Sequence, residues 1–282
     1  MVLAVSPDDL AYECCDAAVD PYSDVTPLLA AKDYAARAVF EPANLLREAR
    51  RQRGLADIAV PAVALLDPDG DIVRHLAASG GGRRHPGWAC YHTEMWTVDL
   101  DGIEIGVVGM AVGAPFAVVV AEQLAASGAE LILSITSAGQ ISAVDELPCF
   151  VLIEKALRDE GTSLHYQPPG RWSHLDDELR RRLAGAFDHL PRPVWPGTSW
   201  TTDAPYRETP CAIEAAEQDD ITCVEMEAAG LYAYATARGQ AVVCFAHITN
   251  TMATTGTDFE KGADNGAHDA LAVARAAAEA LS

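Results

Sequence analysis

The chain has 282 residues, of which half are hydrophobic, and a formal net charge of −21. The excess of acid argues against a nucleic-acid partner, because phosphate contacts need clustered Lys and Arg. No uninterrupted apolar run of about 18 residues is present, so no membrane span is expected. The length allows one large α/β domain or two small ones.

The first 20 residues are acidic and lack a basic stretch before an apolar one, so they do not read as a secretory signal. The seven cysteines are scattered, odd in number and without a C-x-x-C or zinc spacing, which indicates reduced thiols in a cytoplasm. Cys223 and Cys244 lie in strand-like runs and are expected to be buried.

Residues 1–57 differ from the rest of the chain. After an acidic start, "EPANLLREARRQRG" predicts a helix with Pro42 near its start, Leu45 and Leu46 on its apolar side and Gly54 at its end. We therefore expect an N-terminal extension, 1–57, that is partly helical, followed by a separate domain, 58–282.

Strands and helices alternate in the second part, which predicts an α/β domain with a parallel or mixed sheet. The expected strands are "VPAVALL", "YHTEMWTVDL", "IEIGVVGM", "AELILSIT", "VLIEKAL", "DITCVEME" and "QAVVCFAHIT". The expected helices are "APFAVVVAEQLAASG", "LDDELRRRLAGAF", "AAGLYAYATARG" and "AHDALAVARAAAEAL". "DPDGD" and "GGGRRHPG" are expected as a turn and a loop. Ligands of such sheets bind beyond the carboxyl ends of strands.

"VEMEAAG" carries Glu225 and Glu227 on either side of Met226, where a strand passes into a helix. Two acids in an apolar run are costly unless they have polar partners. One interpretation is that Glu227 stabilises the helix N-terminus through the helix dipole. The functional interpretation is a carboxylate that holds two neighbouring sugar hydroxyls with its two oxygens.

Two further segments carry polar residues near strand ends. "SITSAGQI" places Ser137 and Gly139 where backbone N–H groups can approach an anion or a base, although an ordinary loop is also possible. "GTSWTTDAPYRET" suits either a helix start with Thr and Asp caps or a site that stacks on a flat heterocycle.

The order of these segments, with "VEMEAAG" and "TDAPYRE" as the most specific, resembles the nucleoside phosphorylase/uridine phosphorylase superfamily, which includes nucleosidases that use water. The resemblance covers about residues 58–282. It implies an α/β fold, a nucleoside phosphorylase-like mixed-sheet three-layer sandwich with a distorted central barrel. It also implies a homo-oligomer (a dimer or a trimer of dimers), a small nucleoside or nucleotide as ligand, and no metal or organic cofactor, with phosphate as co-substrate of a phosphorylase.

The resemblance also assigns roles to residues. The sugar would be held by Glu227, Met226, Glu225, Ser137 and His92, the last near its 5′ end. The base would be recognised by Gly139, Trp200, Asp203, Tyr206 and Arg207.

Asn250 falls where purine-cleaving relatives carry an Asp that protonates the leaving base, whereas uridine phosphorylases carry Asn. Asn cannot supply a proton, but a pyrimidine or oxo-base can leave with its charge on carbonyl oxygens. Asn250, Arg207 and Lys261 are candidate donors to that charge. A turn-forming role for Asn250 is the alternative.

Relatives that use phosphate bind it with three arginines, whose places are taken here by Ile72, Tyr91 and Ser134. None of these is basic, and a phosphate dianion in a closed site needs cationic partners. The nearby turn instead carries acids. Water is therefore the expected nucleophile, with Asp71 or Asp69 as general base, unless these acids only form a solvated turn.

Arg83 and Arg84 in the predicted loop could replace the missing arginines or hold a nucleotide 5′-phosphate, or be solvated loop charges. His247, inside an apolar strand, fits a core histidine. Three hypotheses result: hydrolysis of an N-glycosidic bond, which is slightly favoured; phosphorolysis by a uridine phosphorylase-like enzyme; and nucleoside binding without catalysis.

Overall fold

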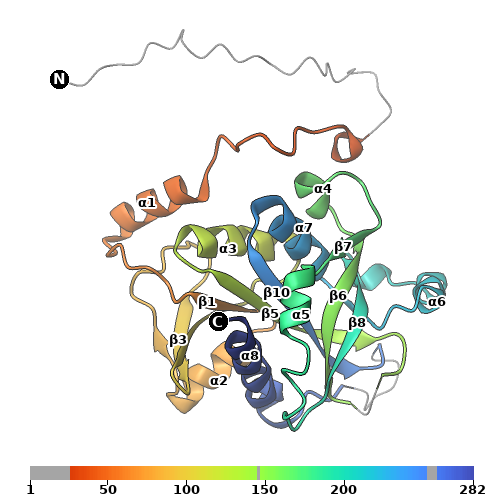
Figure 1. Cartoon of the computed structure of the whole chain (residues 1–282). Coiled ribbons are helices and arrows are strands. Elements are labelled where there is room, and N and C mark those ends of the chain that lie inside the picture. The colour runs from red at the N-terminus through yellow and green to blue at the C-terminus, as the bar shows by residue number, and fades with distance from the viewer. Residues whose placement is uncertain (1–25, 145–146, 253–258) are drawn as a thin grey trace.

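The computed structural model describes residues 26–144, 147–252 and 259–282 (Figure 1). Its strands form one ten-stranded sheet, part of which closes on itself because β10 pairs with both β5 and β6. The closed barrel consists of β5 (Leu131–Gln140), β6 (Cys149–Asp159), β8 (Val194–Thr202), β9 (Cys223–Glu225) and β10 (Ala241–Asn250). The expected mixed α/β fold with a central barrel is confirmed.

The remaining strands extend the sheet from β5. In spatial order they are β1 (Val63–Asp67), β4 (Ile103–Gly109), β3 (Met95–Leu100) and the short edge strand β2 (Arg83–Arg84), while β7 (Trp172–His174) pairs with β6. β10, β5, β1 and β4 are parallel to their neighbours in that series. Their carboxyl ends therefore lie at one edge, which brings the residues after β1, β5 and β10 together.

The central strands are buried along almost their whole length, as expected for near-continuous apolar runs such as "LILSIT" and "AVVCFA". Cys223 and Cys244 are buried, as expected.

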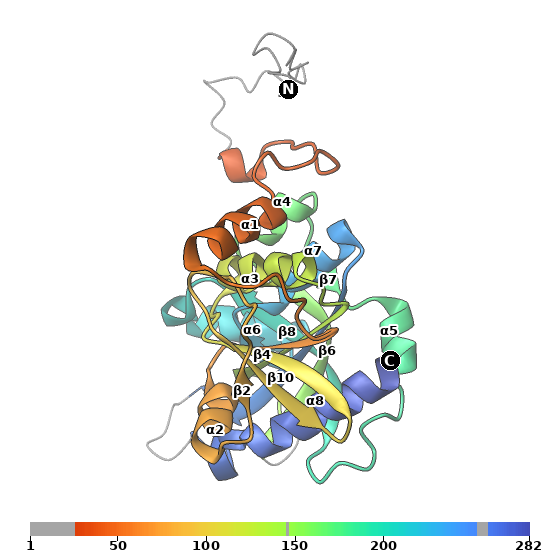
Figure 2. The same ribbon diagram turned by 90° about the vertical axis from the view of Figure 1, so that its left-hand side faces the viewer.

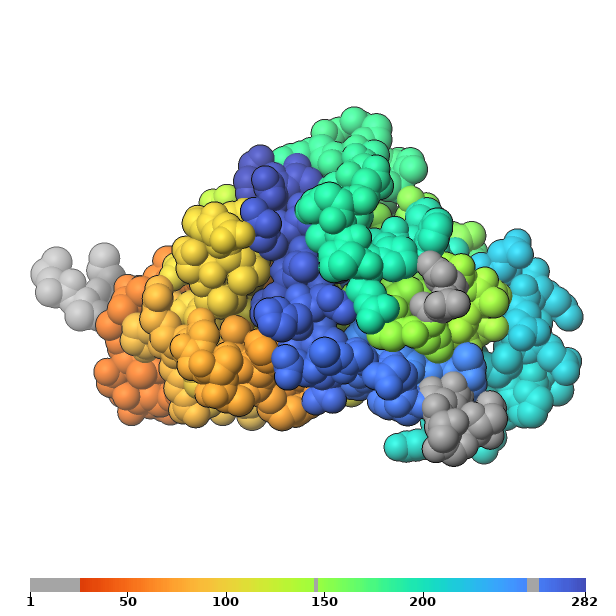
Figure 3. All heavy atoms as spheres, turned by 90° about the horizontal axis from the view of Figure 1, so that it is seen from below, coloured from red at the N-terminus to blue at the C-terminus, as the bar shows by residue number. Residues whose placement is uncertain are grey.

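Helices cover both faces of the sheet and complete a three-layer arrangement (Figures 1 and 2). One layer holds α3 (Ala114–Ala126), α7 (Ala228–Arg238) and the short α4 (Ser163–Tyr166). The other holds α2 (Asp71–Ser79), α8 (Ala267–Leu281) and α5 (Asp177–Arg182). Figure 3 shows α2 in orange beside α8 in dark blue on the lower face. Helix α6 (Pro210–Gln218) lies to one side of the barrel.

Helix α1 (Pro42–Arg53) lies over α3 and ends at Gly54 in a left-handed conformation, as predicted. Leu46 and Ala49 are buried against Ala89. Arg53 donates a hydrogen bond to the Cys90 carbonyl oxygen at 2.9 Å, so the helix is fixed to the segment before β3.

The turn expected at "DPDGD" is present, since the Gly70 N–H donates to the Asp67 carbonyl oxygen at 2.9 Å before α2 begins at Asp71. Two local predictions are wrong. "GGGRRHPG" contains β2, which pairs with β3. The helix expected in "LDDELRRRLAGAF" stops after Arg182, three residues before Gly185 at φ 76°. Among the described helices, none is long and apolar enough to cross a membrane.

Candidate active site

A pocket of about 390 Å³ opens where β5, β9 and β10 meet, a size suited to a small-molecule ligand. Its described lining residues are Ser137, Ala138, Gly139, Pro205, Tyr206, Glu208, Val224, Glu225, Met226, Asn250, Met252 and Phe259. Six of these were expected in the site: Ser137, Gly139, Tyr206, Glu225, Met226 and Asn250. The structure thus brings together residues that are more than 100 positions apart in the sequence.

The strand register sets the geometry at the pocket floor. β10 runs parallel to β5, and after a bulge Asn250 lies opposite Gly139. A Cβ atom at Gly139 would lie 2.6 Å from the Met252 sulfur and 3.4 Å from Asn250 Oδ1, so this position has no room for a side chain. Asn250 is mostly buried and its Nδ2 donates to Thr249 Oγ1 at 3.1 Å.

Glu225 is a fully engaged structural carboxylate. Its Oε2 accepts the N–H groups of Glu227 and Ala228, each at 2.7 Å, at the start of α7. Its Oε1 accepts the hydroxyls of Ser199 and Thr201. The helix-capping role considered for Glu227 therefore belongs to Glu225, because Glu227 makes no side-chain cap bond.

Glu227 is only 2% exposed and retains unused acceptor capacity. One carboxylate oxygen accepts the Gly113 N–H at 2.7 Å, whereas Oε2 has no hydrogen-bond partner among the described residues. Burial, and then the charge of Glu225, raises the pKa of Glu227 to about 8. A buried oxygen without a partner is costly in a folded protein, and Glu227 itself is not among the residues that line the pocket.

The loop after β1 contributes three acids with different partners. Asp67 accepts the N–H groups of Gly70 and Val73 at 3.1 and 2.9 Å, and burial raises its pKa to about 7. Asp69 crosses to β5, where its carboxylate accepts both the Ser137 N–H at 2.7 Å and the Ser137 hydroxyl at 2.8 Å.

Asp71 accepts hydrogen bonds from Lys261 at 2.5 Å and from Arg74 at 2.8 Å. Burial alone would raise the pKa of Asp71, but these two cations lower it. A carboxylate neutralised by two cations is a weak base, so Asp69 is the better placed of the two predicted general bases. Lys261, expected as a donor to the leaving base, instead pairs with Asp71.

A second, small cavity of about 20 Å³ lies behind Ser137, and this volume is sufficient for about one water molecule. It is lined by polar groups that include the three loop acids, Thr136 and His247. His247 stacks on Phe150 with a ring separation of 4.5 Å, and burial, followed by the charge of Lys261, lowers its pKa to about 4. His247 is thus a neutral core histidine, whereas Ser137 lines both cavities.

Several predicted site residues do not line this pocket. Trp200 is only 5% exposed, packs in an apolar cluster and donates its indole N–H to Asp159 at 2.9 Å, which leaves no free face for a base. Asp203 accepts the Gly161 N–H at 2.8 Å. Arg207 lies in the turn after β8 but is not part of the pocket lining, and His92 is exposed beside Phe116.

Arg83 and Arg84 are not on a flexible loop near the pocket, as the phosphate hypothesis required. They form β2 at the far edge of the sheet, beyond β3, β4 and β1. Each pairs with a surface carboxylate, Arg83 with Glu104 and Arg84 with Glu94. The expected position is therefore wrong within this chain, because β1, β4 and β3 lie between the arginines and β5, and both arginines have partners of their own.

Sequence reasoning missed Glu208, which lines the pocket and whose pKa burial raises. The sequence signal that could have identified Glu208 is its position directly after "TDAPYR", a segment already assigned to base recognition. It also missed the apolar pocket residues Met252 and Phe259, which no local pattern distinguishes from packing residues.

The family model of the phosphorylase superfamily matches residues 63–282. A guanosine phosphorylase of Halorubrum lacusprofundi is 27% identical over 139 residues, which are 49% of this chain and 58% of the relative. A uridine phosphorylase of Thermococcus kodakarensis is 27% identical over 199 residues, 62% of this chain and 72% of the relative. The first match thus spans little more than half the relative's length.

Solved structures share the fold. Uridine phosphorylase from Vibrio fischeri ES114 superposes with a TM-score of 0.65 at 19% identity, covering 79% of this chain and 92% of that one. Purine nucleoside phosphorylase from Toxoplasma gondii, in complex with immucillin-H, gives a TM-score of 0.66 at 17% identity, covering 80% and 93%. By the family match over residues 63–282, this chain belongs to the phosphorylase superfamily.

Proposed function

We propose that this protein cleaves the N-glycosidic bond of a nucleoside in the pocket between β5, β9 and β10, with water as the nucleophile. Family membership supports the cleavage, since the named relatives are nucleoside phosphorylases. Glu227 directly follows two pocket residues, and its Oε2 has no hydrogen-bond partner among the described residues, so we assign this carboxyl to a sugar hydroxyl.

The pocket chemistry favours a guanosine-like base. A carboxylate such as Glu208 offers two acceptor oxygens, which match the adjacent N1–H and N2–H groups of guanine. The Asn250 amide can donate to O6 or N7 on the other side and stabilise charge that builds up on the leaving base. The name of the Halorubrum relative, guanosine phosphorylase, agrees with this choice.

The observation that carries the choice of water is the engagement of Ser137 by Asp69. The described pocket lining includes no Lys or Arg, and Lys261 is bound to Asp71. A phosphate dianion would find both Ser137 donors occupied and no Lys or Arg in the described lining. In the proposed step, Asp69 accepts a proton from water, the oxygen bonds to C1′, and the base leaves with the bonding electrons. Solvent then protonates the base.

Phosphorolysis is the second candidate, favoured by the names of both sequence relatives. The test incubates the purified full chain with guanosine, inosine, uridine and adenosine, with and without inorganic phosphate. Chromatography measures the released base, and labelled water reports oxygen entering ribose.

We expect guanosine to give free ribose at a rate independent of phosphate. Ribose 1-phosphate formed only with phosphate would establish phosphorolysis instead. Binding of nucleosides without any base release would leave the protein a non-catalytic binder.

A further inference from the structure

We propose that the Asp69 carboxylate acts as a built-in anion that occupies an oxyanion site on Ser137 and thereby excludes inorganic phosphate. The inference rests on the proposed function in one respect: it names the residue that reserves the attacking position for water. The existence of the anion site itself depends only on the geometry around Ser137.

Ser137 presents two converging donors to one anion. Its backbone N–H bonds Asp69 Oδ2 at 2.7 Å and its hydroxyl bonds Oδ1 at 2.8 Å, so each carboxylate oxygen receives one bond. A phosphate presents oxygens at similar spacing and would satisfy the same pair. Since Ser137 lines both the large pocket and the small cavity behind it, an anion bound there lies where the two meet.

The loop that delivers Asp69 is fixed on both sides. Arg74 donates to the Asp69 carbonyl oxygen at 2.6 Å, and Lys261 holds Asp71. Gly70 has φ +74°, and a Cβ atom there would lie 2.3 Å from the terminal carbon of Met110. The contact between Asp69 and Ser137 therefore follows from a tightly constrained backbone rather than from a mobile side chain.

The local charges explain why phosphate is excluded. Three acids (Asp67, Asp69 and Asp71) line the small cavity, whereas two cations, Lys261 and Arg74, pair with Asp71. Lys261 Nζ lies 3.8 Å from Asp69 Oδ1. Removing the Asp69 carboxylate takes away one negative charge, releases both Ser137 donors, and leaves Lys261, which remains bound to Asp71, beside the vacated position. Two converging donors with less negative charge around them favour an oxyanion.

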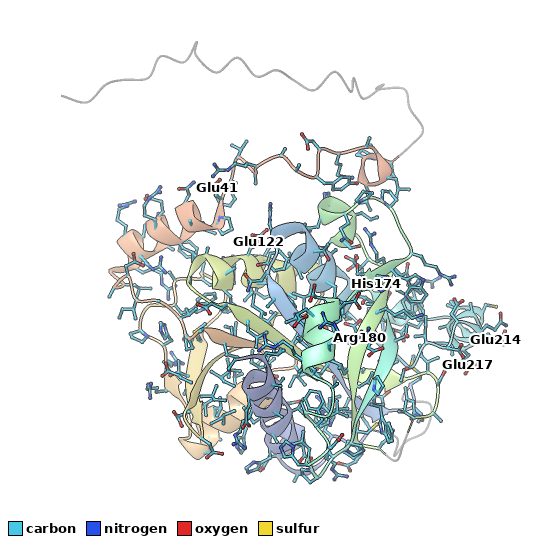
Figure 4. The ribbon with its side chains drawn as sticks, viewed as in Figure 1. Glu41, Glu122, His174, Arg180, Glu214 and Glu217 are labelled. Atoms are coloured by element: carbon cyan, nitrogen blue, oxygen red, sulfur yellow. The ribbon has the colours of Figure 1, made fainter. Side chains whose placement is uncertain are left out.

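The experiment titrates inorganic phosphate into the full chain by isothermal titration calorimetry. The variants are Asp69→Ala and the near-isosteric Asp69→Asn, which keeps the proposal testable if the alanine variant does not fold. Glu214→Gln is the control for loss of one negative charge, because Glu214 is exposed on α6, far from β5 (Figure 4). Adding Ser137→Ala to each Asp69 variant tests whether the Ser137 hydroxyl donates a hydrogen bond to the bound phosphate.

We expect the Asp69 variants to bind phosphate with a Kd at least about tenfold below that of the wild type, or about 1.4 kcal/mol. The control should match the wild type, and Ser137→Ala should remove most of the gain. Equal phosphate affinity in the wild type and the folded Asp69 variants would overturn the proposal. A gain that persists without the Ser137 hydroxyl and appears equally in Glu214→Gln would show general electrostatics only, and would also overturn it. Because binding is measured without nucleoside, failure of the proposed function would not alter this result.

Discussion

The substitution Glu227→Gln tests whether a buried, incompletely partnered carboxyl lies at the pocket. The variant keeps the shape of the side chain and an oxygen for the Gly113 N–H, but it removes the titrating group. The folded-state pKa of about 8 lies above the ordinary value of 4.5, so the folded protein holds this proton more tightly than the unfolded chain does. The contribution of Glu227 to the free energy of unfolding is therefore greatest below pH 4.5 and falls as the pH rises from 4.5 to about 8.

The expected size follows from the linkage between protonation and folding. Between about pH 5.5 and 7.5 the wild type should lose about 1.4 kcal/mol of unfolding free energy per pH unit relative to Glu227→Gln. Over these two units the difference between the proteins should change by about 2 to 3 kcal/mol. Asp67, whose pKa is raised to about 7, has a similar pH dependence in both proteins and cancels in the comparison.

Urea denaturation at several pH values measures this difference, with Glu214→Gln as the control for an exposed acid. The free energy of unfolding of Glu214→Gln should change with pH in the same way as that of the wild type. If the curves of the wild type and Glu227→Gln are also parallel, Glu227 is ionised at ordinary pH and solvated. The inference that Glu227 is a buried, incompletely partnered carboxyl would then fail.

Three further predictions follow from the geometry. Glu208→Gln should lower kcat/KM for guanosine by about 10- to 100-fold and for inosine by less, because inosine lacks the amino group; steady-state kinetics with both nucleosides test this. Lys261→Met should lower the free energy of unfolding at pH 7 but have little effect near pH 3, since the low pKa of Asp71 stabilises the fold only where its carboxylate is ionised; urea denaturation at both pH values tests this. Leu46→Ala should cost about 2–5 kcal/mol, whereas Leu45→Ala at the half-buried neighbour should cost less; equal losses would contradict the packing of α1.

Much of the fold could be predicted because it depends on local patterns. The run "AVVCFAHIT" is apolar enough to be a strand covered on both faces, and Gly54 and Gly239 end α1 and α7 in the left-handed conformation that glycine adopts easily. The failures were also local. "GGGRRHPG" has the composition of a loop, but it contains β2, because Arg83 and Arg84 pair with Thr97 and Trp96 of β3.

The candidate site shows where local reasoning ends. The sequence by itself determined that two acids flank Met226 at a strand-to-helix junction and that acids, not arginines, follow β1. Only the tertiary structure decided that Glu225 caps α7 while Glu227 keeps an oxygen without a partner among the described residues, and that Asp69 reaches Ser137 across 68 positions. Strand identity follows from side-chain pattern within a few residues, whereas hydrogen-bond partners are set by strand order and register, which depend on contacts between distant parts of the chain.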